Sequence, residues 1–179
     1  MLSLLSLDNY HHLLEKCEQE LIQLGECFSH PKYDYLLFNV VFGMNHLFEW
    51  YLRDESIQNS CKTECVRQFN PFSVGKVPKE LKSYYNGLED FPETCAYQET
   101  VRKLCNKAKH FKKVEIEKQG ENYTVTSGSP IAVCGHPEAV CGAFDHYLYS
   151  VSINGQDVDL YQMLKKLHRD WMSFIRAAM

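Results

Sequence analysis

The sequence predicts a mainly α protein: a helical bundle with a small antiparallel β-hairpin or three-stranded sheet inserted before the C-terminal helix. Apolar residues recur at helical spacing over most of residues 1–111, alternate at strand spacing within residues 112–155, and return to helical spacing over residues 156–179. The chain has 179 residues, of which 45% are apolar, so it can bury an ordinary core. We therefore expect residues 1–179 to form a single domain.

Two helices are expected at the start of the chain. The first, over residues 8–28, is amphipathic and acidic, and its apolar face consists of Leu13, Leu14, Cys17, Leu21 and Leu24. Pro31 ends it, because proline disfavours helical geometry in the residue before it. The second helix, over residues 33–54, is rich in apolar residues, so we expect it to lie at the centre of the core.

Two shorter helices are expected over residues 56–68 and 78–85, separated by a loop. A longer helix is expected to begin at residues 90–93. The Asp, Pro and Glu of this segment fit an N-cap acid, an early proline and a Glu three residues after the cap. We expect this helix to extend to Phe111, with Tyr97, Val101, Leu104, Ala108 and Phe111 on its core face.

Alternating apolar residues predict a β-hairpin around a turn at residues 119–122. They are Val114 and Ile116 before the turn, and Tyr123 and Val125 after it. Residues 146–153 predict a third strand that ends at Asn154-Gly155. Residues 158–178 return to helical spacing and predict the last helix of the bundle.

The overall charge argues against one class of function. A net charge of −4 and a pI near 6.1 do not suit a protein that coats polyanions with its whole surface. Residues 102–113 nevertheless contain six lysines or arginines and no acidic residue. We therefore look for a local anion-binding site in this segment.

Neither a membrane span nor an export signal is expected. The longest apolar run, residues 36–52, is interrupted by polar residues such as Asn45 and Glu49 and falls short of the roughly 20 apolar residues that a span needs. The first seven residues lack the basic start of a signal peptide and are followed by Asp8. We expect a soluble, cytoplasmic protein.

Eight cysteines raise the alternatives of disulfides, reduced thiols and a metal site. Without an export signal, reduced thiols are favoured over a disulfide framework. Four cysteines form two pairs that invite a zinc interpretation: Cys61 with Cys65, and Cys134 with Cys141. Neither pair has the standard CxxC spacing, so buried or incidental thiols are the favoured interpretation and no metal or other cofactor is expected.

Arg102, Asn106 and His110 follow one another at i, i+4 spacing, which places them on one face of a helix. A neutral imidazole can take the proton of a ribose 2′-OH, while Arg102 stabilises the charge that gathers on the phosphate. Lys107 and Lys109 can add phosphate contacts. This chemistry needs no metal, and the alternative is a solvated helix end whose cations match the helix dipole.

The second helix carries a polar stripe of its own, with His46 and Glu49 between Asn45 and Arg53. If that helix packs antiparallel to the one that carries Arg102, His46 and Glu49 approach His110. The alternative is a surface pair between Glu49 and Arg53, with His46 at the edge of the core. Aromatic residues near the basic helix likewise allow a base-stacking surface or ordinary packing: Tyr84, Tyr85, Phe91, Tyr97, Tyr123, Tyr147 and Tyr149.

The spacing Asn106-x-x-x-His110 resembles the second half of the RNxxxH motif of HEPN domains, which are helical bundles. The wider pattern Arg102-x-x-x-Asn106-x-x-Lys109-His110-Phe111 is similar to that of a group of uncharacterised bacterial proteins, as are Phe48-Glu49-Trp50 and Trp171. Cys105 stands where the HEPN motif has its arginine. Arg102, one turn earlier, or Lys109 is then the candidate for the positive charge.

The resemblance implies a metal-independent endoribonuclease or RNA-binding module with Asn106 and His110 in its site. It also implies a homodimer, a toxin–antitoxin or anti-phage defence role and a cognate regulatory protein. The alternative is a non-catalytic domain that uses the same polar face to bind a partner protein or the phosphate of a nucleotide.

Overall fold

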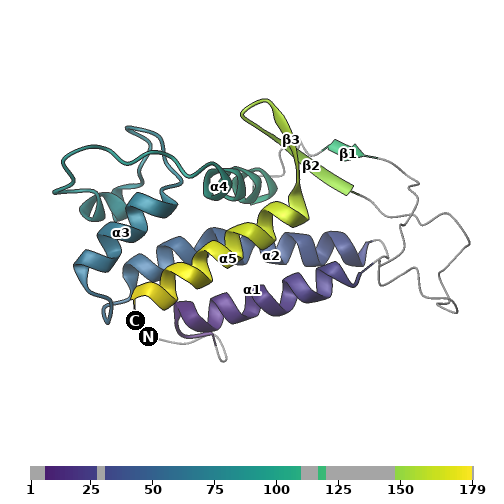
Figure 1. The fold of residues 1–179 in the computed structure, drawn as a ribbon, viewed down its shortest axis with the longest axis horizontal. Coiled ribbons are helices and arrows are strands. Elements are labelled where there is room, and N and C mark those ends of the chain that lie inside the picture. Colours follow the sequence, from purple (N-terminus) through teal and green to yellow (C-terminus); the bar gives the residue numbers. More distant parts are fainter. Residues whose placement is uncertain (1–6, 28–30, 110–116, 120–147, 179) are drawn as a thin grey trace, which may run out of the picture.

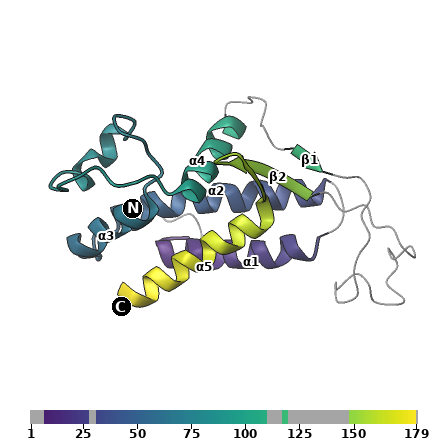
Figure 2. The same cartoon turned by 45° about the horizontal axis from the view of Figure 1, so that its top comes forward.

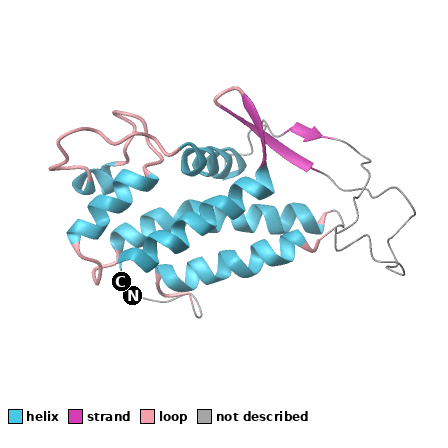
Figure 3. Ribbon diagram, in the orientation of Figure 1, coloured by secondary structure: helices cyan, strands magenta, loops and turns pink. Residues whose placement is uncertain are grey.

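The computed structural model describes residues 7–27, 31–109, 117–119 and 148–178 (Figure 1). The protein is mainly helical, and an antiparallel three-stranded sheet precedes the C-terminal helix (Figure 3). The fold class predicted from the sequence is therefore confirmed. Within the described ranges, no helix combines the length and the apolar content needed to cross a membrane.

Three long helices lie side by side and form the body of the protein: α1 (Tyr10–Gly25), α2 (Lys32–Arg53) and α5 (Leu160–Ala178) (Figures 1 and 2). The side chain of Asn9 caps α1 by accepting a hydrogen bond from the backbone N–H of His12 at 3.0 Å. The buried residues of α1 are the five expected from its spacing, and α2 buries half of its length. Helical periodicity alone was sufficient to identify the buried face of α1.

Helices α1 and α2 approach closely at Gly43. A Cβ atom at this position would lie 2.5 Å from the Sγ atom of Cys17, well inside van der Waals contact. Cys17 is fully buried, and burial raises the pKa of its thiol to about 12. A larger residue at position 43 would therefore force Cys17 on the neighbouring helix to shift.

The centre of the core is aromatic. Four rings make up what we call the Trp171 cluster: Trp171, Tyr51, Phe69 and Phe174. Trp171 is fully buried and stacks on Phe69, with ring centroids 4.0 Å apart and an interplanar angle of 8°. Its indole N–H donates to Gln98 Oε1 at 3.1 Å, and Gln98 Nε2 donates to the carbonyl oxygen of Met44 at 3.0 Å. The indole N–H of Trp171 and the amide group of Gln98 therefore both have hydrogen-bond partners in the core.

The helix α4 (Ala96–Lys109) crosses the bundle and contacts α2. It is seen nearly end-on in Figure 1, where α2 lies in the plane of the page, so the two helices cross steeply rather than pack antiparallel. Helix α3 (Asn59–Phe69) and the short 3₁₀ helix η1 (Lys79–Tyr84) lie at the end of the bundle where α2 finishes. The short helix expected at residues 78–85 is therefore confirmed.

Two helices begin later than expected. Helix α3 starts at Asn59 rather than at residue 56, because Asp54 Oδ1 accepts hydrogen bonds from the backbone N–H and the hydroxyl of Ser56 and holds a turn. Helix α4 starts at Ala96, so the cap expected at residues 90–93 was wrong. The carbonyl groups of that segment are bonded to Asn70 instead.

The sheet has the order β1-β2-β3, with β1 (Glu117–Gln119), β2 (Leu148–Ile153) and β3 (Gln156–Asp159). Asn154 and Gly155 both have positive φ, 53° and 79°, as in the type I′ turns that close two-residue hairpins. Strand β3 pairs with β2 and leads directly into α5. The expected C-terminal helical segment at 156–179 was therefore wrong for its first four residues, which belong to the sheet. Gln119, expected in the turn of a hairpin, instead lies in β1 and pairs with Leu148, so the expected turn was wrong at this residue. The rest of the hairpin expected over residues 114–125 lies outside the described residues, apart from β1.

Candidate phosphate-binding site

A pocket of about 150 Å³ lies where α4 crosses α2 and meets the loop that follows α3. We call it the Arg102 pocket. Its lining residues are Asn45, Phe48 and Glu49 from α2, Pro71, Phe72, Lys76 and Pro78 from the loop, and Arg102 and Asn106 from α4. Two of the three residues at i, i+4 spacing on α4 therefore share one pocket.

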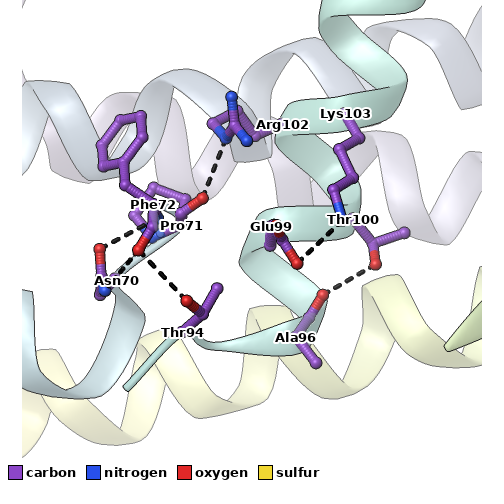
Figure 4. A network of polar contacts seen from close by, with 9 residues as sticks. All are labelled: Asn70, Pro71, Phe72, Thr94, Ala96, Glu99, Thr100, Arg102 and Lys103. Atoms are coloured by element: carbon purple, nitrogen blue, oxygen red, sulfur yellow. Dashed lines mark hydrogen bonds and ion pairs between the residues drawn. The ribbon is translucent and has the colours of Figure 1, made fainter. Parts of the chain in front are cut away.

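Two contacts fix the side chain of Arg102 at the wall of this pocket (Figure 4). Its Nε atom donates a hydrogen bond of 3.0 Å to the carbonyl oxygen of Pro71. Its guanidinium carbon lies 5.2 Å from the centroid of the Phe72 ring, within the range of a cation–π interaction. The two terminal nitrogens of the guanidinium carry the donors that a phosphate or carboxylate would use.

The loop that holds Arg102 is itself organised by Asn70, which is fully buried. Asn70 Nδ2 donates to the carbonyl oxygens of Phe72 and Pro92, at 2.9 and 2.8 Å. Asn70 Oδ1 accepts from the backbone N–H of Phe72 at 3.0 Å and from the hydroxyl of Tyr85 at 2.8 Å. One side chain thus ties the residues on both sides of η1 together and fixes the carbonyl group that receives Arg102 (Figure 4).

The opposite face of α4 belongs to the core. Val101 and Leu104 are buried, as the sequence predicts, while Tyr97 and Ala108 are half-buried. Cys105 is also buried, with only 3% of its surface exposed. The residue directly before Asn106 therefore faces inward, where an unpaired arginine would be costly, whereas the position of Arg102 one turn earlier faces the pocket.

The sequence allowed two interpretations of the polar residues on α2, a part in the site or a surface pair, and Glu49 shows features of both. Glu49 lines the Arg102 pocket, but its carboxylate also lies 3.7 Å from Arg53, so the alternative of a Glu49–Arg53 pair is confirmed. His46 is exposed and is absent from the pocket lining, and its ring lies 6.2 Å from that of Phe42.

The remaining residues of the predicted site are only partly described. Lys107 is half-buried, and Asn106 is exposed at the mouth of the pocket. His110, which is the predicted base, and the side chain of Lys109 lie outside the described residues, as does the predicted core residue Phe111. Within the described part, the site brings together Arg102, Asn106 and Glu49.

Charge and polarity in the pocket suit an anion. Arg102 and Lys76 contribute two positive charges, and the positive charge of Arg53 opposes the negative charge of Glu49. The amide groups of Asn45 and Asn106 add N–H donors. The described residues can therefore bind an anionic oxygen and stabilise charge that develops on it.

Sequence reasoning did not identify the contribution of the loop. Asn70, Pro71 and Phe72 were expected only to lie in the loop that closes the helix over residues 56–68, and Lys76 was not singled out at all. The aromatic Phe72 directly after Asn-Pro in a polar loop indicates that this loop packs against another part of the chain. The partner, Arg102, is 30 residues further along the chain and could not be recognised by local spacing.

The cysteines do not assemble a metal site in the described part of the chain, where no group of three or more His, Cys, Asp or Glu side chains is placed to hold an ion. The six described cysteines are free thiols. Burial raises the pKa of Cys65 well above its ordinary value, which disfavours the thiolate that a metal would require. Its partner Cys61 is half-buried on α3, and Cys134 and Cys141 lie outside the described residues.

The described members of the predicted stacking surface have packing roles. The hydroxyl of Tyr85 donates a hydrogen bond to Asn70. The ring of Phe91 stacks on the ring of Tyr85, with centroids 5.5 Å apart. The Tyr149 hydroxyl donates to Asp34 at 2.6 Å. Tyr84 lies near Lys62, and Tyr97 near Lys166. Tyr123 and Tyr147 lie outside the described residues.

A larger pocket, of about 250 Å³, lies at the end of the bundle near Tyr10, Tyr51 and Cys61. Burial is the main cause that raises the pKa of both tyrosine hydroxyls. Asp54 and the nearby cysteines raise it further by smaller amounts. Both hydroxyls therefore remain neutral at pH 7. Among the described residues, no Lys, Arg or His side chain lines this pocket, so the described lining does not offer the charge that makes the Arg102 pocket a candidate for anion binding.

No protein-family model, curated protein or solved structure matches this chain.

Proposed function

We propose that this protein is a HEPN-like, metal-independent endoribonuclease whose active site is the Arg102 pocket together with His110. The observation that carries the proposal is that Arg102 and Asn106, one turn apart on α4, line the same pocket. The i, i+4 spacing of His110 after Asn106 follows the HEPN motif that the sequence resembles. Cys105, at the position of the motif arginine, is accounted for by its place in the core.

In the proposed reaction, the imidazole of His110 takes the proton of a ribose 2′-OH, and the 2′-oxygen attacks the adjacent phosphorus. The bond from phosphorus to the 5′-oxygen breaks, the leaving oxygen takes up a proton from water, and the imidazolium of His110 returns its proton to the solvent. The products are a 2′,3′-cyclic phosphate and a 5′-hydroxyl end. Arg102 stabilises the charge that gathers on the phosphate oxygens, and Asn106 orients the phosphate by hydrogen bonding.

The same resemblance leads us to propose a homodimer, a role in toxin–antitoxin or anti-phage defence, and a cognate regulatory protein. These proposals rest on the motif alone. They are independent of the geometry of the pocket.

A second candidate is a binding module that holds a nucleotide phosphate or an acidic protein partner without cleaving anything. The observation that favours it is the attachment of Arg102 to the loop, through Pro71 and Phe72, as a structural residue would be attached. In this case the pocket binds an anion, and His110 has no chemical role.

Incubation of wild type and His110→Ala with single-stranded and structured RNA in EDTA separates the two candidates. The nuclease proposal predicts cleavage by wild type only, with 2′,3′-cyclic phosphate at the new ends. RNA binding by both proteins with cleavage by neither supports the binding module. Cleavage by wild type that EDTA abolishes contradicts a metal-independent mechanism.

A further inference from the structure

Helix α2 exposes an aromatic stripe that the core does not use. Tyr35 and Phe38 are 65% and 48% exposed, and Phe42, one turn further, is half-buried. The three residues stand at i, i+3 and i+7, which is one face of a helix. The rings of Phe38 and Phe42 have centroids 4.4 Å apart, so they form a continuous surface. We call these three residues the α2 stripe.

The α2 stripe leads to the Arg102 pocket. The ring of Phe42 lies 6.2 Å from that of His46, and Asn45 and Glu49 on the same helix line the pocket. From Tyr35 to Asn45 the helix rises about 15 Å, at roughly 1.5 Å per residue. This is long enough for about four stacked bases at roughly 3.4 Å per step.

Aromatic rings beside a positively charged pocket form the combination that binds single-stranded nucleic acid. Bases stack on rings regardless of sequence, while cations hold the phosphates. Here the rings are on α2, and the cations, Arg102 and Lys76, lie at the end of the stripe. An apolar protein partner would not use this charge, and a duplex would keep its bases away from the rings.

We propose that the α2 stripe is a base-stacking track for single-stranded RNA, which places the backbone of the strand in the Arg102 pocket. This inference rests on the proposed function in one respect, that the pocket receives a phosphate. It adds the substrate class, an unpaired strand, and the residues that recognise it. Tyr35, Phe38 and Phe42 take no part in the proposed chemistry, so they act on binding.

The test is the affinity of Phe38→Ala for a fluorescently labelled 2′-O-methyl oligouridine, which lacks the free 2′-OH that the proposed cleavage needs, measured by anisotropy in EDTA at fixed salt. Loss of one stacking partner is expected to weaken binding roughly 5- to 100-fold. The matched control is Ile22→Ala, which removes an apolar side chain of similar exposure, 50%, from α1. It should bind as wild type does. A backbone-only oligomer of the same length, without bases, should bind wild type and Phe38→Ala equally.

The outcomes separate this inference from the proposed function. If Phe38→Ala weakens binding but wild type does not cleave RNA, the track stands and the nuclease proposal fails. If wild type cleaves RNA in EDTA while Phe38→Ala binds like Ile22→Ala, the track is refuted and the nuclease stands. If Phe38→Ala leaves affinity unchanged but alters the oligomeric state in sedimentation velocity, the stripe contacts a second copy of the chain and the track is likewise refuted.

Discussion

The Trp171 cluster and the Arg102 pocket share helix α2, and α4 contacts both, yet they differ in exposure and in how their polar groups are held. In the cluster, the rings are buried and the indole N–H of Trp171 donates to Gln98. In the pocket, Asn106 is exposed and Arg102 is half-buried, held by the carbonyl oxygen of Pro71 and the ring of Phe72. Helix α4 contributes Gln98 to one region and Arg102 to the other. Gln98 and Arg102 are one turn apart on α4, so successive turns of one helix serve the core and the proposed chemistry, and substitutions at the two positions can separate them.

The largest expected effect comes from breaking the cluster. Trp171→Ala removes a fully buried ring and leaves Gln98 without its donor, so we expect it to lower the free energy of unfolding by about 3–5 kcal/mol. Chemical denaturation measures this. Trp50, the other tryptophan, is only half-buried on α2, and Trp50→Ala should have a smaller effect. Equal losses would contradict the central place of Trp171.

Asn70→Ala should affect both regions. It removes the partner of the Phe72 backbone N–H and of the Pro92 carbonyl, while the Phe72 carbonyl keeps the bond from Thr94, and we expect a loss of about 1–3 kcal/mol of stability. Because the same loop receives Arg102, RNA cleavage should fall in protein that remains folded. Asn86→Ala, an exposed asparagine after η1, is the control. Unchanged cleavage by folded Asn70→Ala would show that the loop does not position Arg102.

Gly43→Ala tests the packing of α1 on α2 alone. The new methyl group would collide with Cys17, and overpacking of this kind lowers stability by about 1–3 kcal/mol. A double-mutant cycle with Cys17→Ala should show that the two substitutions are coupled, because the smaller side chain makes room for the methyl group. Additive losses in the cycle would place the strain elsewhere.

The smallest expected effect is a pH dependence from His168. Burial between α5 and α1 lowers the pKa of this imidazole, and the carbonyl of Leu14 and the carboxylate of Glu18 oppose the shift. The unfolded chain then binds the proton more readily, so stability should be complete above the ordinary histidine pKa of about 6.5 and should fall as the pH drops toward the lower folded value. Urea titrations across this range should show the fall in wild type, and His168→Gln should lose it. A variant that keeps the full pH dependence would assign the effect to another group.

The sequence was sufficient for the regions where periodicity decides the structure. The buried face of α1 follows from helical spacing, and the interruption of the helices by strands follows from alternation. Prediction from the sequence failed where a contact with a distant residue overrides a local sequence pattern. The capping pattern at residues 90–93 lost to Asn70, and the Asn154-Gly155 turn, read as the end of a strand, in fact joins two strands.

The candidate site was predictable only in part. Arg102 and Asn106 were found because they lie on one helix at a fixed spacing. Lys76, Pro71 and Phe72 reach the same pocket from a loop whose path depends on the buried amide of Asn70. Local spacing carries no information about such a path, and neither does composition.

The most direct test of the account is RNA cleavage by Arg102→Ala and Lys103→Ala in EDTA, with thermal stability measured on the same samples. The two cations are neighbours on α4, but Lys103 is 57% exposed and pairs with Glu99 at 3.0 Å, away from the pocket (Figure 4). We predict that Arg102→Ala slows cleavage by roughly 100-fold or more, as loss of a charge-stabilising donor does, while Lys103→Ala cleaves at the wild-type rate. Equal rates for the two variants, at equal stability, would contradict the assignment of the Arg102 pocket as the functional site.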